Sequence, residues 1–291
     1  MIANPVAGRG RGESSARALA EHLRAAGCRV EVFTTTRRGD ARERAAAIDS
    51  DVASVVSVGG DGTLSEVLSG LRSHDRPLRD HAIPVAQLAL GTANVLAMDL
   101  GLPRDPAQLA QVVIAGRVQR VDVARVGDRL CFLGASAGYD ARVVHGLERL
   151  RRGPITKWTW ARAAITEFRE YVAPELSVEV DGTRAPGTFG MLLIANVVNY
   201  AGWPSLADDR VLDDGRFEAY LFPARSRRDL TRHALRGLFA RFPGGDVARI
   251  QGRHFRVECA EPVALQVDGD AAGHAPFELT VEATPCRMLV P

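Results

Sequence analysis

The residues with the clearest chemical potential lie in a glycine-rich turn, Gly59–Thr63, where three glycines surround Asp61. An apolar run, Val52–Val58, precedes this turn, and apolar residues at helical spacing follow it. Backbone N–H groups of such a turn can crowd around an anion, and a helix N-terminus favours negative charge. Because the carboxylate of Asp61 repels a bare phosphate, we expect a divalent metal ion between them. The turn therefore predicts a nucleotide phosphate site for metal-dependent phosphoryl transfer.

The same residues also have a purely structural interpretation. Thr63-x-x-Glu66 matches a capping box, with Thr63 as the N-cap and Glu66 as the third helical residue. Gly59, Gly60 and Gly62 are also residues that ordinary turns favour. Taken alone, the motif leaves both interpretations open.

Two further glycine-rich turns favour the functional interpretation. Asn4–Gly12 follows a very short apolar start and precedes a helical pattern, and Leu90–Asn94 follows the apolar run Ile83–Leu90. The spacing fits neither the Rossmann fingerprint nor a P-loop. Three strand-to-helix turns at one end of a parallel sheet would converge on a single crevice, where open α/β sheets bind ligands.

Together with later motifs, these turns resemble the diacylglycerol kinase and sphingosine kinase catalytic domain family of lipid kinases, within the NAD kinase-like superfamily. The resemblance covers nearly the whole chain. The Gly-Gly-Asp-Gly-Thr element alone is shared with NAD kinases and, loosely, with phosphofructokinases, whereas the full ordered set is more specific. The family-like motifs are Asn4-Pro5-x-x-Gly8, Gly59–Thr63 with Glu66, Gly91-Thr92-x-Asn94, Gly138–Ala141, Asn196 with Ala201-Gly202, Asp213–Gly215 and Val267–Asp270.

The resemblance implies an ATP- and Mg²⁺-dependent lipid kinase that transfers the γ-phosphate to a hydroxyl of diacylglycerol, a sphingoid base or a related lipid. It places Asp61 in the metal–phosphate network and makes Asp268, with Asp270 beside it, the carboxylate that activates the acceptor alcohol. The nucleotide-binding residues that it implies are Asn4, Gly8, Gly59, Gly60, Gly62, Thr63, Glu66, Gly91, Thr92 and Asn94.

Three further assignments follow from the resemblance, each beside a structural alternative. Asp213 and Asp214 would hold a structural metal ion, but they also fit a solvated turn. Asp140 would contact the acceptor, but it also suits the start of a helix. Without the resemblance, Asp268 followed by a glycine is an ordinary hairpin signal.

The chain departs from the family at three places. Val95 follows Asn94 where many bacterial diacylglycerol kinases have aspartate, so their metal network cannot be transferred whole. Asp270 replaces the glutamate of Asp-Gly-Glu and shortens its reach by about 1.5 Å, a gap that a water can bridge. The first strand is unusually short, which leaves a truncated start open.

These departures keep two alternatives in view. One is an NAD kinase-like or other small-molecule kinase, which would share the glycine-rich site and ignore lipid vesicles. The other is a nucleotide- or lipid-binding relative without kinase activity, for which Val95 and Asp270 are the motivation. The sequence does not name the acceptor.

The pattern of elements predicts an α/β domain with a doubly wound parallel sheet over residues 1–123, followed by a mostly antiparallel β-sandwich over residues 124–283. The segment 284–291 is expected to return to the first domain. Among the predicted strands are Arg29–Thr34, Gln119–Val126 and Ile250–Cys259, and among the predicted helices are Glu13–Ala26, Thr63–Leu71 and Pro106–Ala115.

Composition fits a soluble intracellular enzyme. If the substrate is a lipid, as the resemblance implies, the protein visits the inner membrane face from the cytoplasm. Lys plus Arg is 37 and Asp plus Glu is 35, so no strong field drives nucleic-acid binding. The four cysteines are scattered, and no apolar stretch approaches the roughly 20 residues of a membrane span. Two basic segments, Arg149–Trp160 and Arg225–Phe242, are candidates for peripheral membrane contact, against core packing of the tryptophans and an ordinary solvated helix. The oligomeric state stays open, a homodimer included.

Overall fold

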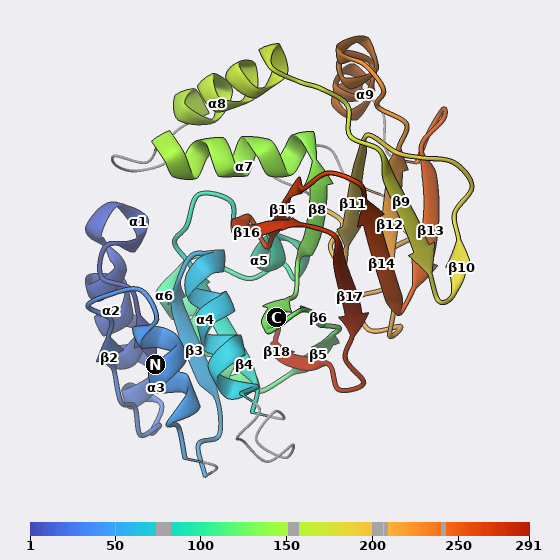
Figure 1. The fold of residues 1–291 in the computed structure, drawn as a ribbon. Coiled ribbons are helices and arrows are strands. Elements are labelled where there is room, and N and C mark those ends of the chain that lie inside the picture. Colours follow the sequence, from blue (N-terminus) through green and yellow to red (C-terminus); the bar gives the residue numbers. More distant parts are fainter. Residues whose placement is uncertain (50, 74–82, 151–156, 200–205, 207–208, 240–242) are drawn as a thin grey trace. The chain divides into compact units, whose positions relative to one another are not determined.

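The structure, a computed structural model, describes the chain except for residues 50, 74–82, 151–156, 200–205, 207–208 and 240–242 (Figure 1). The chain divides into two compact units. The N-terminal unit comprises Met1–Val121 together with Thr284–Pro291, and the C-terminal unit comprises Asp122–Ala283. Each unit builds its own sheets and its own hydrophobic core.

The N-terminal unit is an α/β domain around a six-stranded sheet of order β2-β1-β3-β4-β18-β5, parallel except for β5. Its strands are β1 (Ile2–Ala3), β2 (Phe33–Thr34), β3 (Val55–Gly59), β4 (Val85–Ala89), β5 (Val118–Val121) and β18 (Cys286–Leu289). Its helices are α1 (Ala7–Gly10), α2 (Gly12–Ala25), α3 (Asp40–Ala46), α4 (Asp61–Leu71), α5 (Val95–Asp99) and α6 (Pro106–Ala115).

The central strands β3 and β4 are buried along their whole length, as expected for a parallel sheet covered on both faces. Alternate residues of these strands face opposite sides. Val56, Val58 and Leu88 pack with α2 and α6, while Ser57 and Gln87 lie on the other face. The predicted α/β class with a parallel sheet is confirmed.

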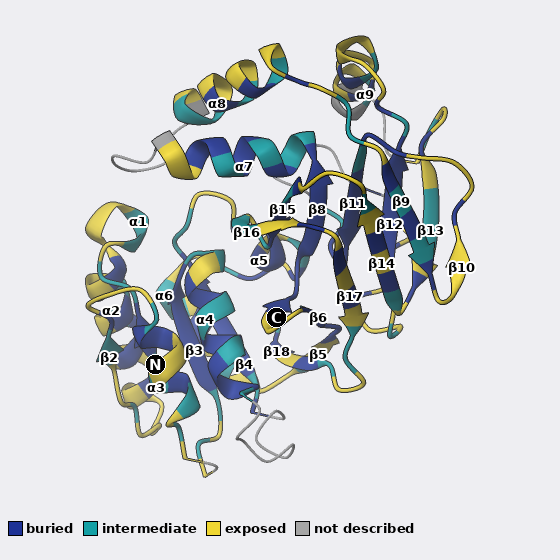
Figure 2. Cartoon of the chain, in the orientation of Figure 1, coloured by how far each residue is buried: buried dark blue, intermediate teal, exposed yellow. Residues whose placement is uncertain are grey.

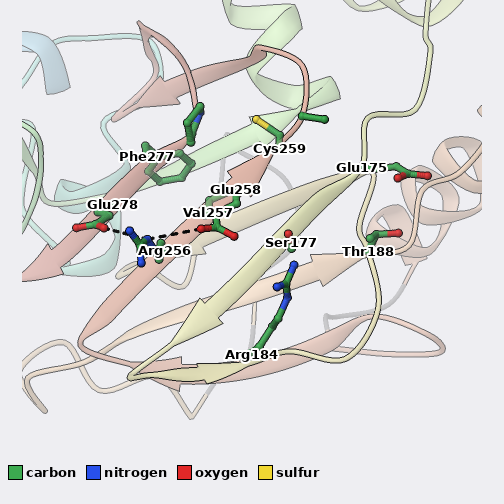
Figure 3. Close-up of a pocket in the computed structure, with 12 residues that line it drawn as sticks. Glu175, Ser177, Arg184, Thr188, Arg256, Val257, Glu258, Cys259, Phe277 and Glu278 are labelled. Carbon is green, nitrogen blue, oxygen red and sulfur yellow. Dashed lines mark ion pairs between the residues drawn. The ribbon is translucent and has the colours of Figure 1, made fainter.

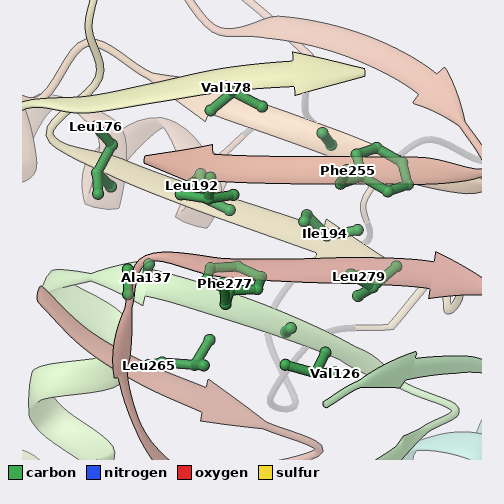
Figure 4. Packing of buried hydrophobic residues seen from close by; sticks show 14 of the residues in the cluster. Val126, Ala137, Leu176, Val178, Leu192, Ile194, Phe255, Leu265, Phe277 and Leu279 are labelled. Carbon is green, nitrogen blue, oxygen red and sulfur yellow. The ribbon is translucent and has the colours of Figure 1, made fainter. Parts of the chain in front are cut away.

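The C-terminal unit contains two six-stranded antiparallel sheets, of order β10-β9-β14-β17-β6-β7 and β13-β12-β11-β8-β15-β16. Phe255 and Leu279 of the first sheet and Leu192 and Ile194 of the second contribute to one buried cluster (Figure 4). The predicted antiparallel sandwich is confirmed. The strands are β6 (Ala124–Val126), β7 (Arg129–Cys131), β8 (Gly134–Gly138), β9 (Leu176–Val180), β10 (Thr183–Arg184), β11 (Met191–Ala195), β12 (Phe217–Phe222), β13 (Ala248–Gly252), β14 (His254–Cys259), β15 (Val263–Val267), β16 (Asp270–Ala275) and β17 (Phe277–Val281).

Two stretches predicted as single strands are each two strands in different sheets. Gln119–Val126 contains most of β5 and the whole of β6, and Ile250–Cys259 contains the end of β13 and the whole of β14. Both stretches keep their β-pattern across the break and lack a strong turn signal, so the pattern reports extended backbone without reporting which sheet it joins.

Three helices belong to the C-terminal unit: α7 (Tyr139–Leu150), α8 (Lys157–Arg169) and α9 (Arg227–Phe239). Parts of the two predicted membrane-contact segments, 151–156 and 240–242, lie outside the described residues. Core packing, the structural alternative for the tryptophans, is wrong for Trp158, which is 84% exposed, whereas Trp160 packs against the α7–α8 cluster. No helix in the described part of the chain is long and apolar enough to cross a bilayer.

Candidate active site

The three glycine-rich turns of the N-terminal unit follow neighbouring parallel strands. Strand β1 leads into the turn at Asn4, β3 into the turn at Gly60, and β4 into the turn at Gly91. The Asn4 amide donates to the Val58 carbonyl at 2.9 Å, and the Leu90 amide donates to the Gly59 carbonyl at 2.9 Å. The turns therefore leave the same edge of the sheet side by side, as predicted from their sequence.

The second and third turns touch through their glycines. A Cβ added at Gly91 would stand 2.7 Å from the Cα of Gly60 and 2.7 Å from Oδ1 of Asn94, so no side chain fits there. Asn94 adopts a left-handed conformation, with φ of 53°. Its Oδ1 accepts the Gly91 N–H at 2.8 Å and its Nδ2 donates to the Gly91 carbonyl at 2.7 Å. The Asn94 side chain therefore shapes the turn from within.

The first turn meets the second through Asn4, whose Nδ2 lies 3.5 Å from Oγ1 of Thr63. Thr63 in turn fills the space beside Gly59, where an added Cβ would stand 2.4 Å from that hydroxyl. Gly8 has a φ of 60°, and an added Cβ there would lie 3.3 Å from the side chain of Leu90. Gly59 and Gly91 are thus required by packing, and Gly8 by its backbone conformation.

Gly62 is different, because neither packing nor backbone conformation explains it. It is exposed in the first turn of α4, its φ lies outside the left-handed region, and an added Cβ meets nothing within 4 Å. Glycine inside a helix costs about 0.5–1 kcal/mol relative to alanine. The residue before α4 gives the helix no side-chain cap. This open, uncapped helix N-terminus fits an anionic ligand.

Asp61 is half-buried, and one oxygen of its carboxylate is buried and unsatisfied. Its Oδ2 accepts the Val95 N–H at 3.3 Å, while its Oδ1 is buried and has no hydrogen-bond partner among the described residues. Burial raises the pKa of this carboxyl group, against the amides of Val95 and Asn94, which favour its charged form. A buried oxygen without a donor is a suitable ligand for a hard cation, so the residues fit the Mg²⁺ ion that the family implies.

Two polar side chains lie on the strands beneath this turn. Ser57 of β3 and Gln87 of β4 pair in register, and both are fully buried. Ser57 Oγ and both polar atoms of the Gln87 amide lack hydrogen-bond partners in the described part of the chain. Sequence reasoning missed both residues, although a serine and a glutamine inside apolar strands were the available signal.

Glu66 does not form the capping box that was the structural alternative. The residue preceding α4 is Gly60, and no side chain caps that end. Instead, the Glu66 carboxylate accepts the Gly39 N–H at 3.0 Å and holds the loop before α3. Thr92 is exposed beside Gly91. The structure thus brings the three turns that contain the predicted nucleotide residues side by side, while the nucleotide-binding role of Glu66, whose carboxylate contacts Gly39, stays a prediction.

In the C-terminal unit, Asp268 occupies a tight Asp-Gly hairpin turn between β15 and β16. Asp268 and Gly269 both have positive φ values, 52° and 85°. The carboxylate accepts the N–H groups of Leu133 at 2.8 Å and Gly134 at 3.0 Å through Oδ1, and that of Phe132 at 3.1 Å through Oδ2. The hairpin alternative is therefore realised, and the carboxylate has a structural task in addition to any catalytic one.

The environment of Asp268 also prepares its carboxylate to accept a proton. Burial raises its pKa to about 7, against the three peptide hydrogen bonds and the Cys131 thiol, which favour the charged form. A general base is most effective when its pKa lies near the operating pH. Burial and the Asp268 charge raise the pKa of Cys131 in return, which keeps that thiol protonated.

A buried polar network connects the Asp268 turn with Asp140. The Gly269 N–H donates to Gln266 Oε1 at 2.8 Å, and Gln266 Nε2 donates to Ser136 Oγ at 3.0 Å. The Ser136 hydroxyl donates in turn to Oδ2 of Asp140, in the first turn of α7. Asp270 begins β16 opposite Val267. The structure therefore links Asp140 to Gly269, the residue after Asp268, through the side chains of Ser136 and Gln266, which no sequence motif marks.

We expect Ser136 and Asp140 to be energetically coupled. Ser136→Ala leaves the Gln266 donor and the Asp140 acceptor without this partner, so unfolding free energy should fall by about 1–3 kcal/mol. In a double-mutant cycle with Asp140→Ala, urea denaturation should give a coupling of about 0.5–3 kcal/mol. Additive effects would show that the network is not a unit.

The predicted metal residues Asp213 and Asp214 lie near a third carboxylate, Asp122. Asp214 ion-pairs with Arg210 at 3.8 Å, and the Gly215 N–H donates to Asp122 at 2.6 Å. Burial raises the pKa of Asp122, helped by the charges of Asp214 and Asp213. No group of three or more His, Cys, Asp and Glu side chains in the described chain has a metal-binding arrangement. The metal assignment stays a prediction. Sequence reasoning missed Asp122, although an aspartate between two valines was a signal that could have identified it.

A broad hollow of about 800 Å³ opens on the sheet that contains β9, β14 and β17 (Figure 3). Ion pairs join Arg256 to Glu278 and Glu258 on its floor. Cross-strand charge pairs of this kind are ordinary on a solvated sheet face. None of the predicted site residues lines the hollow, and we assign it no role in the reaction.

Comparison with known proteins identifies the family. The family model described as the diacylglycerol kinase catalytic domain matches residues 1–126, and the YegS C-terminal NAD kinase beta sandwich-like domain matches residues 134–290. The diacylglycerol kinases of Staphylococcus carnosus and Bacillus subtilis are 26% and 25% identical, over 95% and 96% of this chain and 89% and 91% of theirs. A crystal structure of a diacylglycerol kinase from Bacillus anthracis has the same fold, with a TM-score of 0.76, 19% identity and coverage of 100% of this chain and 95% of that one. The chain therefore belongs to the diacylglycerol kinase family of lipid kinases, with an N-terminal catalytic domain and a YegS-type β-sandwich domain.

Proposed function

We propose that this lipid kinase transfers the γ-phosphate of ATP to the free hydroxyl of diacylglycerol, with Mg²⁺ as the metal ion. The observation that carries the proposal is the combination of Asp61 and Gly62 at the start of α4. Asp61 offers a buried oxygen without a hydrogen-bond donor, and Gly62, which has no side chain, leaves the uncapped N-terminus of α4 open. Together they match a metal-bound polyphosphate.

In this proposal the turns at Asn4, Gly60 and Gly91 bind the nucleotide phosphates, and Asp61 holds the metal ion. Mg²⁺ supplies charge neutralisation at the phosphate oxygens. Asp268 accepts the proton of the acceptor hydroxyl, because its pKa near 7 leaves a basic carboxylate at neutral pH. Asn94 and Thr63 hold the turns in shape.

Diacylglycerol is the proposed acceptor because the curated relatives that match nearly the whole chain carry that activity in their names. The test is transfer of labelled phosphate from ATP and Mg²⁺ to diacylglycerol, monoacylglycerol, sphingosine and ceramide in mixed micelles, with NAD as the soluble acceptor. Label on diacylglycerol supports the proposal. Label only on a sphingoid base or only on NAD would show that this compound, and not diacylglycerol, is the acceptor. No label despite ATP binding would favour the alternative of a binding protein without kinase activity.

Gly62→Ala should raise stability and weaken nucleotide binding. The alanine side chain meets no protein atom and removes a helix glycine, so unfolding free energy should rise by about 0.5–1 kcal/mol. The same methyl group would stand where we place the phosphates. Gly70→Ala, in the same helix, is the matched control. Its Cβ would lie 2.3 Å from the Arg42 carbonyl, so we expect lower stability with unchanged affinity per folded molecule. Calorimetry with an ATP analogue and thermal melts distinguish the two.

A further inference from the structure

Two buried polar side chains lie next to each other on the central strands of the N-terminal unit. Ser57 of β3 and Gln87 of β4 pair in the parallel register, and both residues are fully buried. Strand β3 is buried along its whole length (Figure 2). The neighbouring residues of the two strands are apolar: Val56, Val58, Ala86 and Leu88. Because a buried polar group without a partner destabilises the fold, this pair calls for a physical explanation.

Both side chains lie on the face of the sheet that α4 covers. A Cβ added at Gly59 would stand 2.4 Å from the hydroxyl of Thr63 in α4, so this face of β3 meets the first turns of that helix. Residues two apart on a strand share a face, which places the Ser57 side chain on the same side as Gly59. Gln87 shares this face because it pairs with Ser57 in register. The pair therefore lies beneath the helix that begins at Asp61.

Four buried polar atoms of this region have no hydrogen-bond partner in the described part of the chain. They are Oγ of Ser57, Oε1 and Nε2 of Gln87, and Oδ1 of Asp61. The Gln87 amide lies within interaction distance of the Asp61 carboxyl group, yet no direct hydrogen bond joins them. Val95 contributes only its backbone N–H, which donates to the other oxygen of Asp61. Because the four atoms include donors and acceptors, a molecule that both donates and accepts can satisfy them.

We propose that Ser57 and Gln87 are positioning residues that orient the Asp61 carboxylate through bound water. A buried water makes about three hydrogen bonds to polar groups that have no other partner, and the four atoms provide that number. Water held there fixes Oδ1 of Asp61 in one orientation. Groups that orient a metal-binding carboxylate in this way strengthen metal binding. The inference rests on the proposed function, in which Asp61 holds the Mg²⁺ ion.

The first test measures nucleotide binding, with no phosphoryl transfer. The Kd of a non-hydrolysable ATP analogue is measured by calorimetry with saturating Mg²⁺ and again with a chelator. Gln87→Met keeps the length of the side chain and removes its polar atoms, so the Kd with Mg²⁺ should rise about 10–100-fold while the metal-free Kd stays unchanged. Ser57→Ala should act in the same direction. Equal changes in the two Kd values, or no change in either, would overturn the proposal.

Unfolding midpoints distinguish a positioning residue from one that only holds the fold. Gln87 makes no hydrogen bond to the described protein, so Gln87→Met should leave the midpoint of the nucleotide-free enzyme nearly unchanged. Val56→Ala, on the opposite face of β3, is the matched control. Val56 packs in the cluster of α2 and α6, so this variant should melt earlier and keep the wild-type ratio of the two Kd values. If Gln87→Met melted earlier and kept that ratio too, Gln87 would be a structural residue.

Two further measurements test the link to Asp61. In an Asp61→Asn background there is no carboxylate to orient, so Gln87→Met should not weaken Mg²⁺-dependent binding further. The same fold loss in both backgrounds would show that Gln87 acts elsewhere. A crystal structure of the nucleotide-free enzyme should show ordered water between the Gln87 amide and Oδ1 of Asp61. A direct bond or a dry contact there would refute the water bridge.

A kinase assay separates failure of this inference from failure of the proposed function. Gln87→Met should raise the KM for ATP with Mg²⁺ and leave the KM for the acceptor unchanged. A wild type that phosphorylates no acceptor would refute the proposed function, while the result on Mg²⁺-dependent binding would stand. An active wild type whose KM and Kd values Gln87→Met reproduces would refute only the positioning role.

Discussion

Asp61→Asn should strongly reduce phosphoryl transfer in a protein that is at least as stable as the wild type. The buried carboxylate is penalised by desolvation, and one of its oxygens has no donor in the described structure, so a neutral amide should be tolerated. Loss of the metal ligand should cost several kcal/mol of transition-state stabilisation, or about 10²–10³-fold in turnover. The measurements are kcat with saturating ATP and Mg²⁺ and the midpoint of thermal unfolding.

The sign of the pH effect provides a second readout. Burial raises the pKa of Asp61 in the folded state above its ordinary value of 3.8. In the pH interval between that value and the raised pKa, the folded state therefore binds more protons than the unfolded state. This group therefore makes stability fall as pH rises through the interval, and Asp61→Asn should remove that contribution. The variant should also lose the thermal stabilisation that ATP analogue with Mg²⁺ gives the wild type, as chelation of the metal does.

Asp105→Asn is the matched control in the same unit. Asp105 precedes α6, outside the glycine-rich turns, and its carboxylate accepts the Gln108 N–H at 3.0 Å. Asparagine caps helices about as well, so the change in stability should be small and turnover should not change. If Asp61→Asn kept wild-type turnover, or if both variants lost it, Asp61 would not be the metal ligand.

The sequence predicted the glycine-rich turns well because such turns can be recognised from local residue types. A strand, a run of glycines and a helix start can be recognised without knowing the fold, and Gly60 and Gly91 lie in contact in the structure. The capping-box alternative for Glu66 is wrong because a capping box is also a local pattern, whereas the partner of the Glu66 carboxylate, the Gly39 N–H, is distant in sequence. The nucleotide-binding role of Glu66 stays a prediction.

The residues that sequence reasoning missed depend on tertiary contacts. Gln266 and Ser136 sit in apolar strands and become meaningful only because those strands pair in register. Val121 and Asp122 are adjacent in sequence but belong to different compact units, a division that the continuous β-pattern hides. The two tasks of Asp268 could not be separated from sequence either, because the peptide groups that it binds are more than a hundred residues away.

That double role leads to the remaining large effect: Asp268→Asn should reduce both activity and stability. Loss of the general base should lower kcat about 10²–10⁴-fold. In the wild type, peptide N–H groups donate to both oxygens of the Asp268 carboxylate. The side-chain NH₂ of the asparagine would face one of these donors, which should lower the unfolding free energy by about 1–3 kcal/mol. In the wild type, kcat/KM should rise with pH through about 7, and the variant should lose this rise.

Asp181 offers a matched control for the structural part of this effect. It also begins a two-residue Asp-Gly hairpin with positive φ, and its carboxylate accepts the N–H groups of Arg253 at 3.0 Å and His254 at 2.8 Å. Asp181→Asn should therefore lower stability with unchanged turnover per folded molecule. If Asp268→Asn behaved in the same way, its carboxylate would serve only to hold the turn. A loss of turnover in Asp268→Asn alone, measured where both variants are folded, assigns proton transfer to Asp268.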